Sequence, residues 1–188
     1  MGKVILAGIA AGVALFIWGF VSHMFTPLGT MGVSTHPHEA MLLPAIQQTT
    51  TAPGFYVFPG MDMTKKPTKE EEAAWAERYR TGPHGVLILG ANGRDAMDAP
   101  RLITELVTNL FTGILLAFLL GRLATGIGSF VSGGILAFLI GWTSISVPYW
   151  NWYSFPPTVT LVEMIDQVIG GAIVGLVVGL FLVSKKAS

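Results

Sequence analysis

The sequence carries two pairs in which an acid is followed four residues later by an amide, each inside a long apolar run. Glu105 and Asn109 form the first pair, and Glu163 and Gln167 form the second. An ionisable side chain inside an apolar helix is costly, so it indicates a functional role such as binding a proton or a cation. Both acids also lie near expected helix starts, where they would cap the helix and favour its dipole. The residues leave both interpretations open.

Four other residues have types that could do chemistry. Asp166 lies beside the second pair, and His23 closes the first apolar run at the expected depth of the acids, so it could pair with either. One histidine at this depth is too few for a haem held by this chain alone. His36 and His38 form a weak His-x-His metal signal, because no third ligand follows at a telling spacing. We therefore expect no metal and no other cofactor.

The composition identifies the main solvent of the chain as lipid. Hydrophobic residues make up 52% and charged residues only 12%, against about 25% charge in soluble domains. Lys+Arg and Asp+Glu are equal at 11 each, so no basic field would attract nucleic acid. There is no cysteine, no phosphate-binding loop and no His-Glu-x-x-His. We expect a protein that is not an enzyme.

Four apolar runs of about 20 residues match the thickness of a bilayer core. They predict an all-α integral membrane protein with four transmembrane helices and a small mixed extracytoplasmic cap between helices one and two. The first run is too long for a typical signal-peptide core, so we expect an uncleaved helix. The predicted segments are helix one at 1–24, the cap at 25–100, helix two at 101–123, helix three at 124–147, an aromatic outer loop at 148–159, and helix four with a cytoplasmic tail at 160–188.

The chain contains an internal repeat. A shift of 58 residues places Glu105, Asn109, Gly113, Ala117 and Gly121 on Glu163, Gln167, Gly171, Gly175 and Gly179. The first and third runs match more weakly, pairing Gly12 with Gly134, Phe16 with Phe138, Gly19 with Gly141 and Ser22 with Ser144. A third match, aromatic-Tyr-x-Phe-Pro, comprises Tyr56, Phe58 and Pro59 in one copy and Tyr153, Phe155 and Pro156 in the other. This order predicts two tandem helical hairpins that form a parallel repeat with a pseudo-two-fold axis along the membrane normal.

Small residues recur every four positions and predict close helix packing, since lipid gives little hydrophobic drive between helices. Besides those of the repeat, the expected packing residues are Gly8 and Gly12 in helix one and Gly133, Ala137 and Gly141 in helix three. Four short helices cannot bury all these stripes against one another. We therefore expect contacts with other membrane proteins or self-association, within the lipid bilayer.

The segment between helices one and two predicts small structured elements. "STHPHEAMLLPAIQQTT" indicates a short helix with Thr35 as cap and Pro37 in its first turn. "TKEEEAAWAERYR" indicates a second helix, in which Thr68 and Glu71 form a capping box and Gly82 follows the end. "GVLILGANG" indicates a strand that runs into a turn. The Tyr-x-Phe-Pro elements suit the membrane interface.

Basic residues predict the orientation. Lys3, Arg122, Lys185 and Lys186 flank the runs on one side of a four-crossing chain, and the positive-inside rule makes that side cytoplasmic. We expect a multi-pass protein of a bacterial inner membrane with both termini in the cytoplasm. The leading functional hypothesis is a non-catalytic accessory subunit that packs against other membrane proteins. The alternative is a small proton or cation transporter or channel that uses Glu105 and Glu163.

Overall fold

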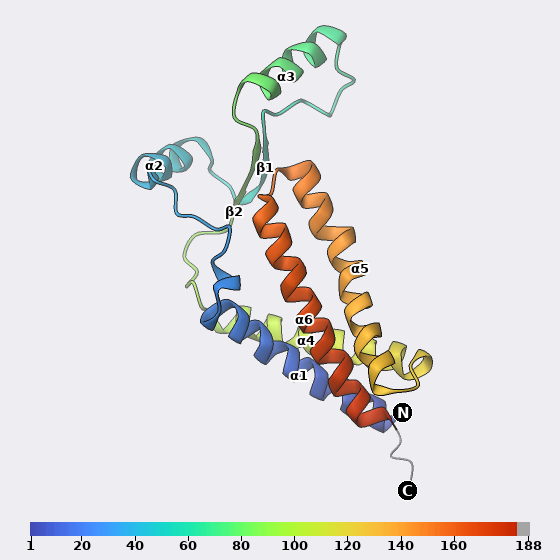
Figure 1. Cartoon of the computed structure of the whole chain (residues 1–188). Coiled ribbons are helices and arrows are strands. Elements are labelled where there is room, and N and C mark those ends of the chain that lie inside the picture. Colours follow the sequence, from blue (N-terminus) through green and yellow to red (C-terminus); the bar gives the residue numbers. More distant parts are fainter. Residues whose placement is uncertain (184–188) are drawn as a thin grey trace, which may run out of the picture. The chain divides into compact units, whose positions relative to one another are not determined.

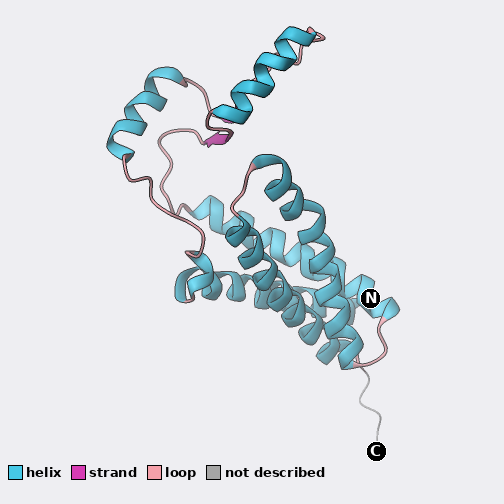
Figure 2. Ribbon diagram, turned by 45° about the horizontal axis from the view of Figure 1, so that its top comes forward, coloured by secondary structure: helices cyan, strands magenta, loops and turns pink. Residues whose placement is uncertain are grey.

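The computed structural model describes residues 1–183 and is mostly helical, with one small sheet (Figures 1 and 2). Lys185 and Lys186, which the predicted orientation uses, lie outside the described residues. In chain order the elements are α1 (Gly2–Phe25), the 3₁₀ helix η1 (Pro27–Gly29), α2 (Glu39–Thr49), β1 (Gly54–Phe58), α3 (Lys69–Thr81), β2 (Gly85–Leu89), α4 (Ala99–Leu123), α5 (Ile127–Tyr153) and α6 (Pro157–Leu182).

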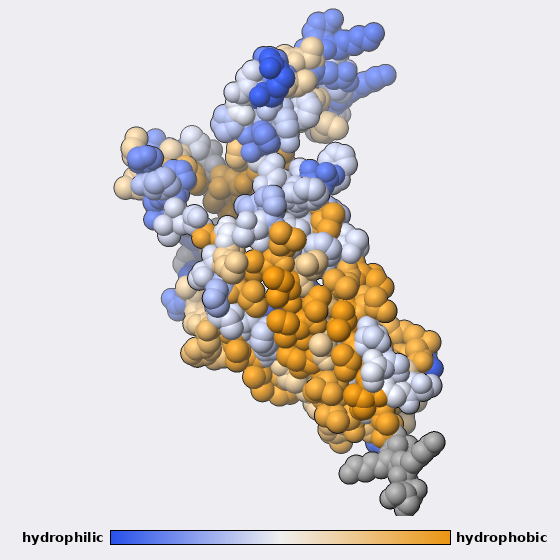
Figure 3. Space-filling view, in the orientation of Figure 1, coloured by the Kyte–Doolittle hydropathy of each residue, from blue (hydrophilic) through white to orange (hydrophobic). Residues whose placement is uncertain are grey.

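Four of these helices, α1, α4, α5 and α6, are long and apolar enough to cross a membrane. They contain 24, 25, 27 and 26 residues. At 1.5 Å per residue each is about 36 Å or longer, which exceeds the roughly 30 Å of a hydrocarbon core. The visible surface over α5 and α6 is largely hydrophobic, whereas α3 is largely hydrophilic (Figure 3). The prediction of four membrane-spanning lengths is confirmed.

Local signals explain where α4 starts and how it meets α5. The Asp98 side chain accepts a hydrogen bond from the Arg101 backbone N–H at 3.0 Å, and Pro100 occupies the first turn. After α4, the Ser129 hydroxyl accepts bonds from the N–H groups of Thr125 and Gly126, both at 3.0 Å. A side chain thus satisfies the backbone at each of these helix starts.

The region between α5 and α6 differs from the expected outer loop at 148–159. α5 continues through Pro148 to Tyr153, and α6 begins at Pro157, which leaves only three residues between them. Membrane helices tolerate an internal proline. Thr160 and Glu163 have the spacing of a capping box but do not cap α6. Thr160 already lies inside the first turn of this helix, where its hydroxyl donates to the Pro156 carbonyl at 3.5 Å.

α1 and α4 approach each other at glycines. A Cβ built on Gly12 would lie 2.5 Å from the Leu110 Cα, and one on Gly8 would lie 2.5 Å from the Ile114 Cα. Gly113 meets the backbone of Gly8 and Gly12 from the other side. Only hydrogen fits at these positions, so the backbones of the two helices are in direct contact.

α5 and α6 use the same device with different partners. Gly171 faces the backbone of Gly134, and Gly175 faces the backbone of Phe130. Gly134 is buried, while the predicted stripe of Gly133, Ala137 and Gly141 is only half-buried. The stripe that contacts α6 therefore lies one residue away from the expected one.

The two glycine contacts are not superposed by the repeat. In the first hairpin a Cβ on Gly12 would meet Leu110. The repeat pairs Gly12 with Gly134 and Leu110 with Val168, so it predicts that Gly134 lies opposite Val168. In the structure a Cβ on Gly134 would instead meet Gly171. The offset is three residues, close to one helical turn. The two pairs thus share a glycine contact but differ in register.

A second compact unit comprises 34–94 and 149–155. In it β1 and β2 pair antiparallel, with Tyr56 opposite Leu87. Phe55 packs edge-to-face on Tyr153, with ring centroids 5.4 Å apart. The Trp75 indole N–H donates to the Pro59 carbonyl at 2.9 Å, which joins α3 to the segment after β1.

Two of the three local predictions for this unit are confirmed. Thr68 and Glu71 form a complete capping box at the start of α3, and the predicted second strand is β2. The predicted cap at Thr35 is wrong, because α2 starts at Glu39 with His38 at the N-cap position and no side-chain cap. Since His36 and Pro37 stand outside the helix, Thr35 is too far from its first N–H groups.

Two alanine substitutions in α1 test the glycine contact. We expect Gly12→Ala to destabilise the bundle by about 1–3 kcal/mol, because its methyl group would overlap the α4 backbone. Gly19→Ala is the matched control, since nothing lies within 4 Å of a Cβ there and alanine is the better helix former. Thermal unfolding of both variants in one detergent would measure the difference. Equal unfolding temperatures would contradict direct backbone contact.

Candidate functional site

The first acid–amide pair is a hydrogen-bonded unit on the surface of α4. The Asn109 side-chain N–H donates to Glu105 Oε1 at 2.9 Å, and in residues 1–183 no other side chain bonds to this carboxylate. Glu105 is exposed within the chain and Asn109 is half-buried. Thr108 is also exposed, and its hydroxyl donates to the Glu105 carbonyl at 2.9 Å. The exposed surface of α4 over its N-terminal half therefore includes polar groups, beside the exposed apolar side chains of Ile103 and Val107.

Glu105 and His23 line one cavity of about 350 Å³ between α1 and α4. Its other walls are mostly apolar, among them Phe16, Phe20 and Leu102. The two side chains are not paired, because His23 Nδ1 lies 2.9 Å from the Ser22 hydroxyl and 3.0 Å from the Gly19 carbonyl. The structure therefore brings the predicted histidine near the first acid without an ion pair.

The second acid–amide pair lies in different surroundings. Glu163 is half-buried in α6 and lines neither the cavity of Glu105 nor the groove described next. Asp166, one turn further, has a buried Oδ1 atom with no hydrogen-bond partner among residues 1–183. The indole N–H of Trp18 in α1 is also buried and has no partner in this part of the chain. Sequence reasoning missed Trp18, since a tryptophan inside an apolar helix carries no signal of a polar role.

The two amides of the repeat meet in a groove of about 420 Å³ that we call the amide groove. Its polar lining consists of Asn109, Thr112 and Gln167, and all four long helices contribute to its walls. The apolar lining residues are Leu15, Leu115, Leu116, Ala137, Phe138 and Gly141. None of the lining side chains is charged. The two amides thus line one groove, whereas Glu105 and Glu163 do not share a cavity.

The predicted metal signal gains no support from geometry. His36 and His38 stand with ring centroids 6.3 Å apart, and the His38 backbone N–H donates to His36 Nδ1 at 3.1 Å. Within residues 1–183, no group of three His, Cys, Asp or Glu side chains is arranged to hold a metal ion.

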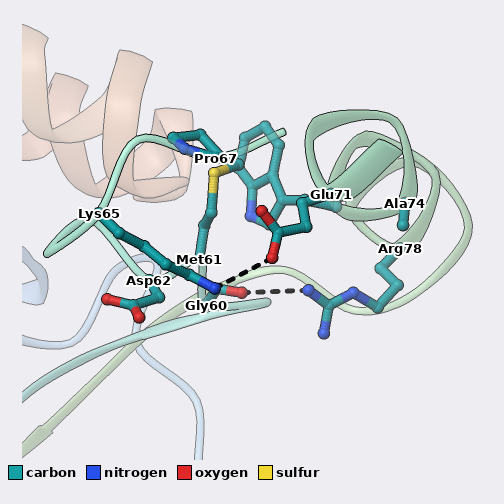
Figure 4. A pocket seen from close by; sticks show the side chains of 9 residues that line it. Gly60, Met61, Asp62, Lys65, Pro67, Glu71, Ala74 and Arg78 are labelled. Carbon is teal, nitrogen blue, oxygen red and sulfur yellow. Dashed lines mark hydrogen bonds and ion pairs between the residues drawn. The ribbon is translucent and has the colours of Figure 1, made fainter. Parts of the chain in front are cut away.

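The second unit has a cavity of about 230 Å³ against α3 (Figure 4). Lys65 bonds to Glu71 Oε1 at 3.1 Å, and the Arg78 guanidinium donates to the Gly60 carbonyl at 3.2 Å. The charged groups on the cavity wall therefore already have partners, and they hold the 60–67 segment against α3. These bonds on the cavity wall have a structural role, because they fix the 60–67 loop.

The two Tyr-x-Phe-Pro motifs have different backbones. Tyr56 and Phe58 lie in β1, and a cis peptide bond joins Phe58 to Pro59. Tyr153 ends α5, and Ser154 after it has φ of 61°. The motif is shared in sequence and not in local structure.

With four helices of membrane-spanning length, the chain fits the class of multi-pass membrane proteins. No protein-family model, curated protein or solved structure matches it. A function for the chain is therefore inferred from its physical features.

The capping box of α3 gives a prediction about pH. The Thr68 backbone N–H at 2.9 Å, and next the Lys65 ammonium, lower the pKa of Glu71 below its usual value. A lowered folded pKa adds stability that is present above the unfolded pKa of about 4.3 and lost as the pH falls through the folded value. We expect the first turn of α3 to fray in that acidic range. An NMR titration that follows the Glu71 carboxyl carbon would measure this.

Lys65→Ala is the matched variant for this titration. It removes the smaller of the two main causes, so the pKa of Glu71 should rise but remain below its usual value. A Glu71 that titrates like an unstructured glutamate in the unmodified protein would contradict the capping box.

Proposed function

We propose that this chain is a non-catalytic subunit that binds another membrane protein inside the bilayer. The observation that carries the proposal is the exposed Glu105 carboxylate, whose one hydrogen-bonding side chain in residues 1–183 is Asn109. Glu105 is the seventh residue of α4, about 9 Å from its start. A carboxylate exposed to lipid at this depth is unfavourable, although less so than at the helix centre, where the cost is about 2.5–3.5 kcal/mol. A partner that supplies hydrogen-bond donors removes this cost.

The exposed face of α4 has the form of a helix-docking surface. Its N-terminal half presents Glu105 and Thr108 beside the apolar Ile103 and Val107. Its C-terminal half presents Phe111, Leu115 and Leu119, which are 62%, 53% and 48% exposed. This combination favours a partner helix that is largely apolar, with a basic or amide side chain opposite Glu105.

A second copy of the chain is a poorer occupant of this face. In a two-fold dimer with its axis along the membrane normal, equal residues meet at equal depth, so Glu105 would face Glu105 of the copy. Like charges at close range are unfavourable unless they share a proton. Charge complementarity therefore favours a different protein.

The packing residues also bear on the proposal. Gly12, Gly113, Gly171 and Gly175 are buried against neighbouring helices of the same chain. Small-residue stripes are thus largely used inside the chain, and they contribute less to partner binding than the sequence alone indicates. The polar face of α4 is the feature that calls for a partner.

The proposal includes a topology of two tandem hairpins with both termini in the cytoplasm. In its support, Leu182 near the end of α6 lies against Gly121 near the end of α4. Val4 and Leu182 also pack against one apolar cluster that includes Leu120 of α4. These contacts support a common end of the bundle for Lys3 and Arg122, and by the positive-inside rule we propose that this end faces the cytoplasm. The membrane that we propose is a bacterial plasma membrane.

Substitution of Glu105 tests the subunit proposal. In mild detergent we expect the protein to migrate as a large particle with a stoichiometric partner chain, identified by mass spectrometry. Glu105→Ala should reduce the retained partner about tenfold or more, since a charge-assisted hydrogen bond is lost. Glu105→Gln, which keeps hydrogen bonding without charge, should have a smaller effect.

Glu70→Gln is the control, because Glu70 is an exposed glutamate on α3. A particle that contains only this chain would contradict the proposal. So would a partner that Glu105→Ala retains in full.

A second candidate function, handling of protons or cations, rests on the buried and unpartnered Oδ1 of Asp166. Asp166 is the tenth residue of α6, about 14 Å from its start, so its carboxylate lies deep in the expected span. This carboxylate joins Glu105 and Glu163 as a candidate for transport.

Flux measurements in liposomes test this alternative. Asp166→Asn should abolish proton or cation flux if Asp166 binds the ion, whereas the double variant Glu105→Gln with Glu163→Gln should do so if the two glutamates act together. Liposomes with the unmodified protein that conduct no more than empty liposomes would exclude both forms.

A further inference from the structure

We infer that the amide groove binds a neutral, lipid-soluble carbonyl compound of the chemical class of the isoprenoid quinones. The groove is lined by Asn109, Thr112 and Gln167 among apolar walls from all four long helices. A mostly apolar site of several hundred cubic ångströms with a few convergent polar groups is the usual form of a small-molecule site. This inference does not rest on the proposed subunit function.

The polar groups of the groove are available for a ligand. In residues 1–183 the side chains of Gln167 and Thr112 have no hydrogen-bond partner. The Asn109 amide nitrogen donates to Glu105, so its carbonyl oxygen remains free to accept. Unpartnered polar groups are costly in lipid, and a ligand with carbonyl oxygens would accept hydrogen bonds from Gln167 and Thr112.

Charge and depth narrow the class of ligand. No charged side chain lines the groove, which favours a neutral molecule over a lipid with a charged headgroup. Asn109 and Gln167 are each ten residues from the start of their helices, about 15 Å along the axis. That is roughly the midplane of a 30 Å core, below the level of glycerolipid headgroups. Quinones carry carbonyl groups on a molecule apolar enough to reach this depth.

Size separates a small molecule from a partner helix. The groove has a volume of about 420 Å³, and residues of all four long helices line it, among them Leu15 of α1 and Gln167 of α6. The width of a helix with its side chains is about 10 Å, so a whole helix does not enter a space of this size. A flat ring with a thin apolar tail is the better occupant.

Retention of native lipids is the first half of the test. The protein, purified from its own membranes in mild detergent, is extracted with solvent, and quinone per chain is measured by absorbance and mass spectrometry. We expect near-stoichiometric quinone with the unmodified protein and a loss of about tenfold with Gln167→Leu plus Thr112→Val. Thr143→Val, which removes an exposed hydroxyl of α5 outside the groove, should retain it.

Binding of a defined probe is the second half. A short-tailed benzoquinone is titrated into protein in phosphatidylcholine nanodiscs, and quenching of tryptophan fluorescence is recorded. Trp18 is a suitable reporter, because its Cδ1 lies 3.7 Å from a Cβ built on Gly170, which also contacts Leu15 and Phe138 of the groove wall. We expect saturable quenching, with a Kd about tenfold higher in the double variant.

Diacylglycerol, a neutral lipid whose carbonyls are esters, is titrated as competitor in the same nanodiscs. Failure of diacylglycerol to displace the quinone supports the inference. Displacement by diacylglycerol overturns the assignment to quinones. Quenching that is not saturable, or equal in the control and the double variant, overturns the site itself.

Discussion

Direct contact between helix backbones is the constraint on which the membrane part of this protein depends. Between apolar helices in lipid, burial of hydrophobic surface gives little attraction, so van der Waals contact and close approach must hold the bundle. Gly12 and Gly113 provide that contact between α1 and α4, and Gly134 and Gly171 provide it between α5 and α6. Because each contact fixes which helix faces are turned inward, it also fixes which polar side chains are left facing outward or into grooves.

This constraint explains why α4 carries both a polar surface and part of a groove. Its glycine and alanine stripe, with buried Gly113 and Ala117, faces inward. Glu105 and Thr108 are then turned to the outside, while Asn109 and Thr112 line the amide groove among the four long helices. The hydrogen bond from Asn109 to Glu105 connects the two features, so a partner bound at Glu105 would also affect the orientation of the amide in the groove.

The sequence was most informative where structure is decided locally. Apolar length predicted the four long helices, and the cap at Thr68 followed from a side chain that bonds to an N–H group three residues on. Local reasoning failed where surroundings decide. A proline usually ends a helix in a soluble protein, but α5 continues through Pro148. Thr160 has the spacing of a helix cap but lies inside α6, which starts at Pro157. The small-residue periodicity of α5 was visible, yet whether Gly133 or Gly134 meets α6 is decided by tertiary packing.

The candidate site shows the same division at a longer range. The repeat predicted that Asn109 and Gln167 are equivalent, and both line the amide groove. It also pairs Glu105 with Glu163, yet Glu105 is exposed and Glu163 is half-buried, and the register of the two glycine contacts differs by about one turn. One turn is enough to move a side chain by about 5 Å along the helix axis and to give it different neighbours. A repeated motif in a membrane protein therefore predicts which residues share a stripe, while the helix contacts decide which of them share a site.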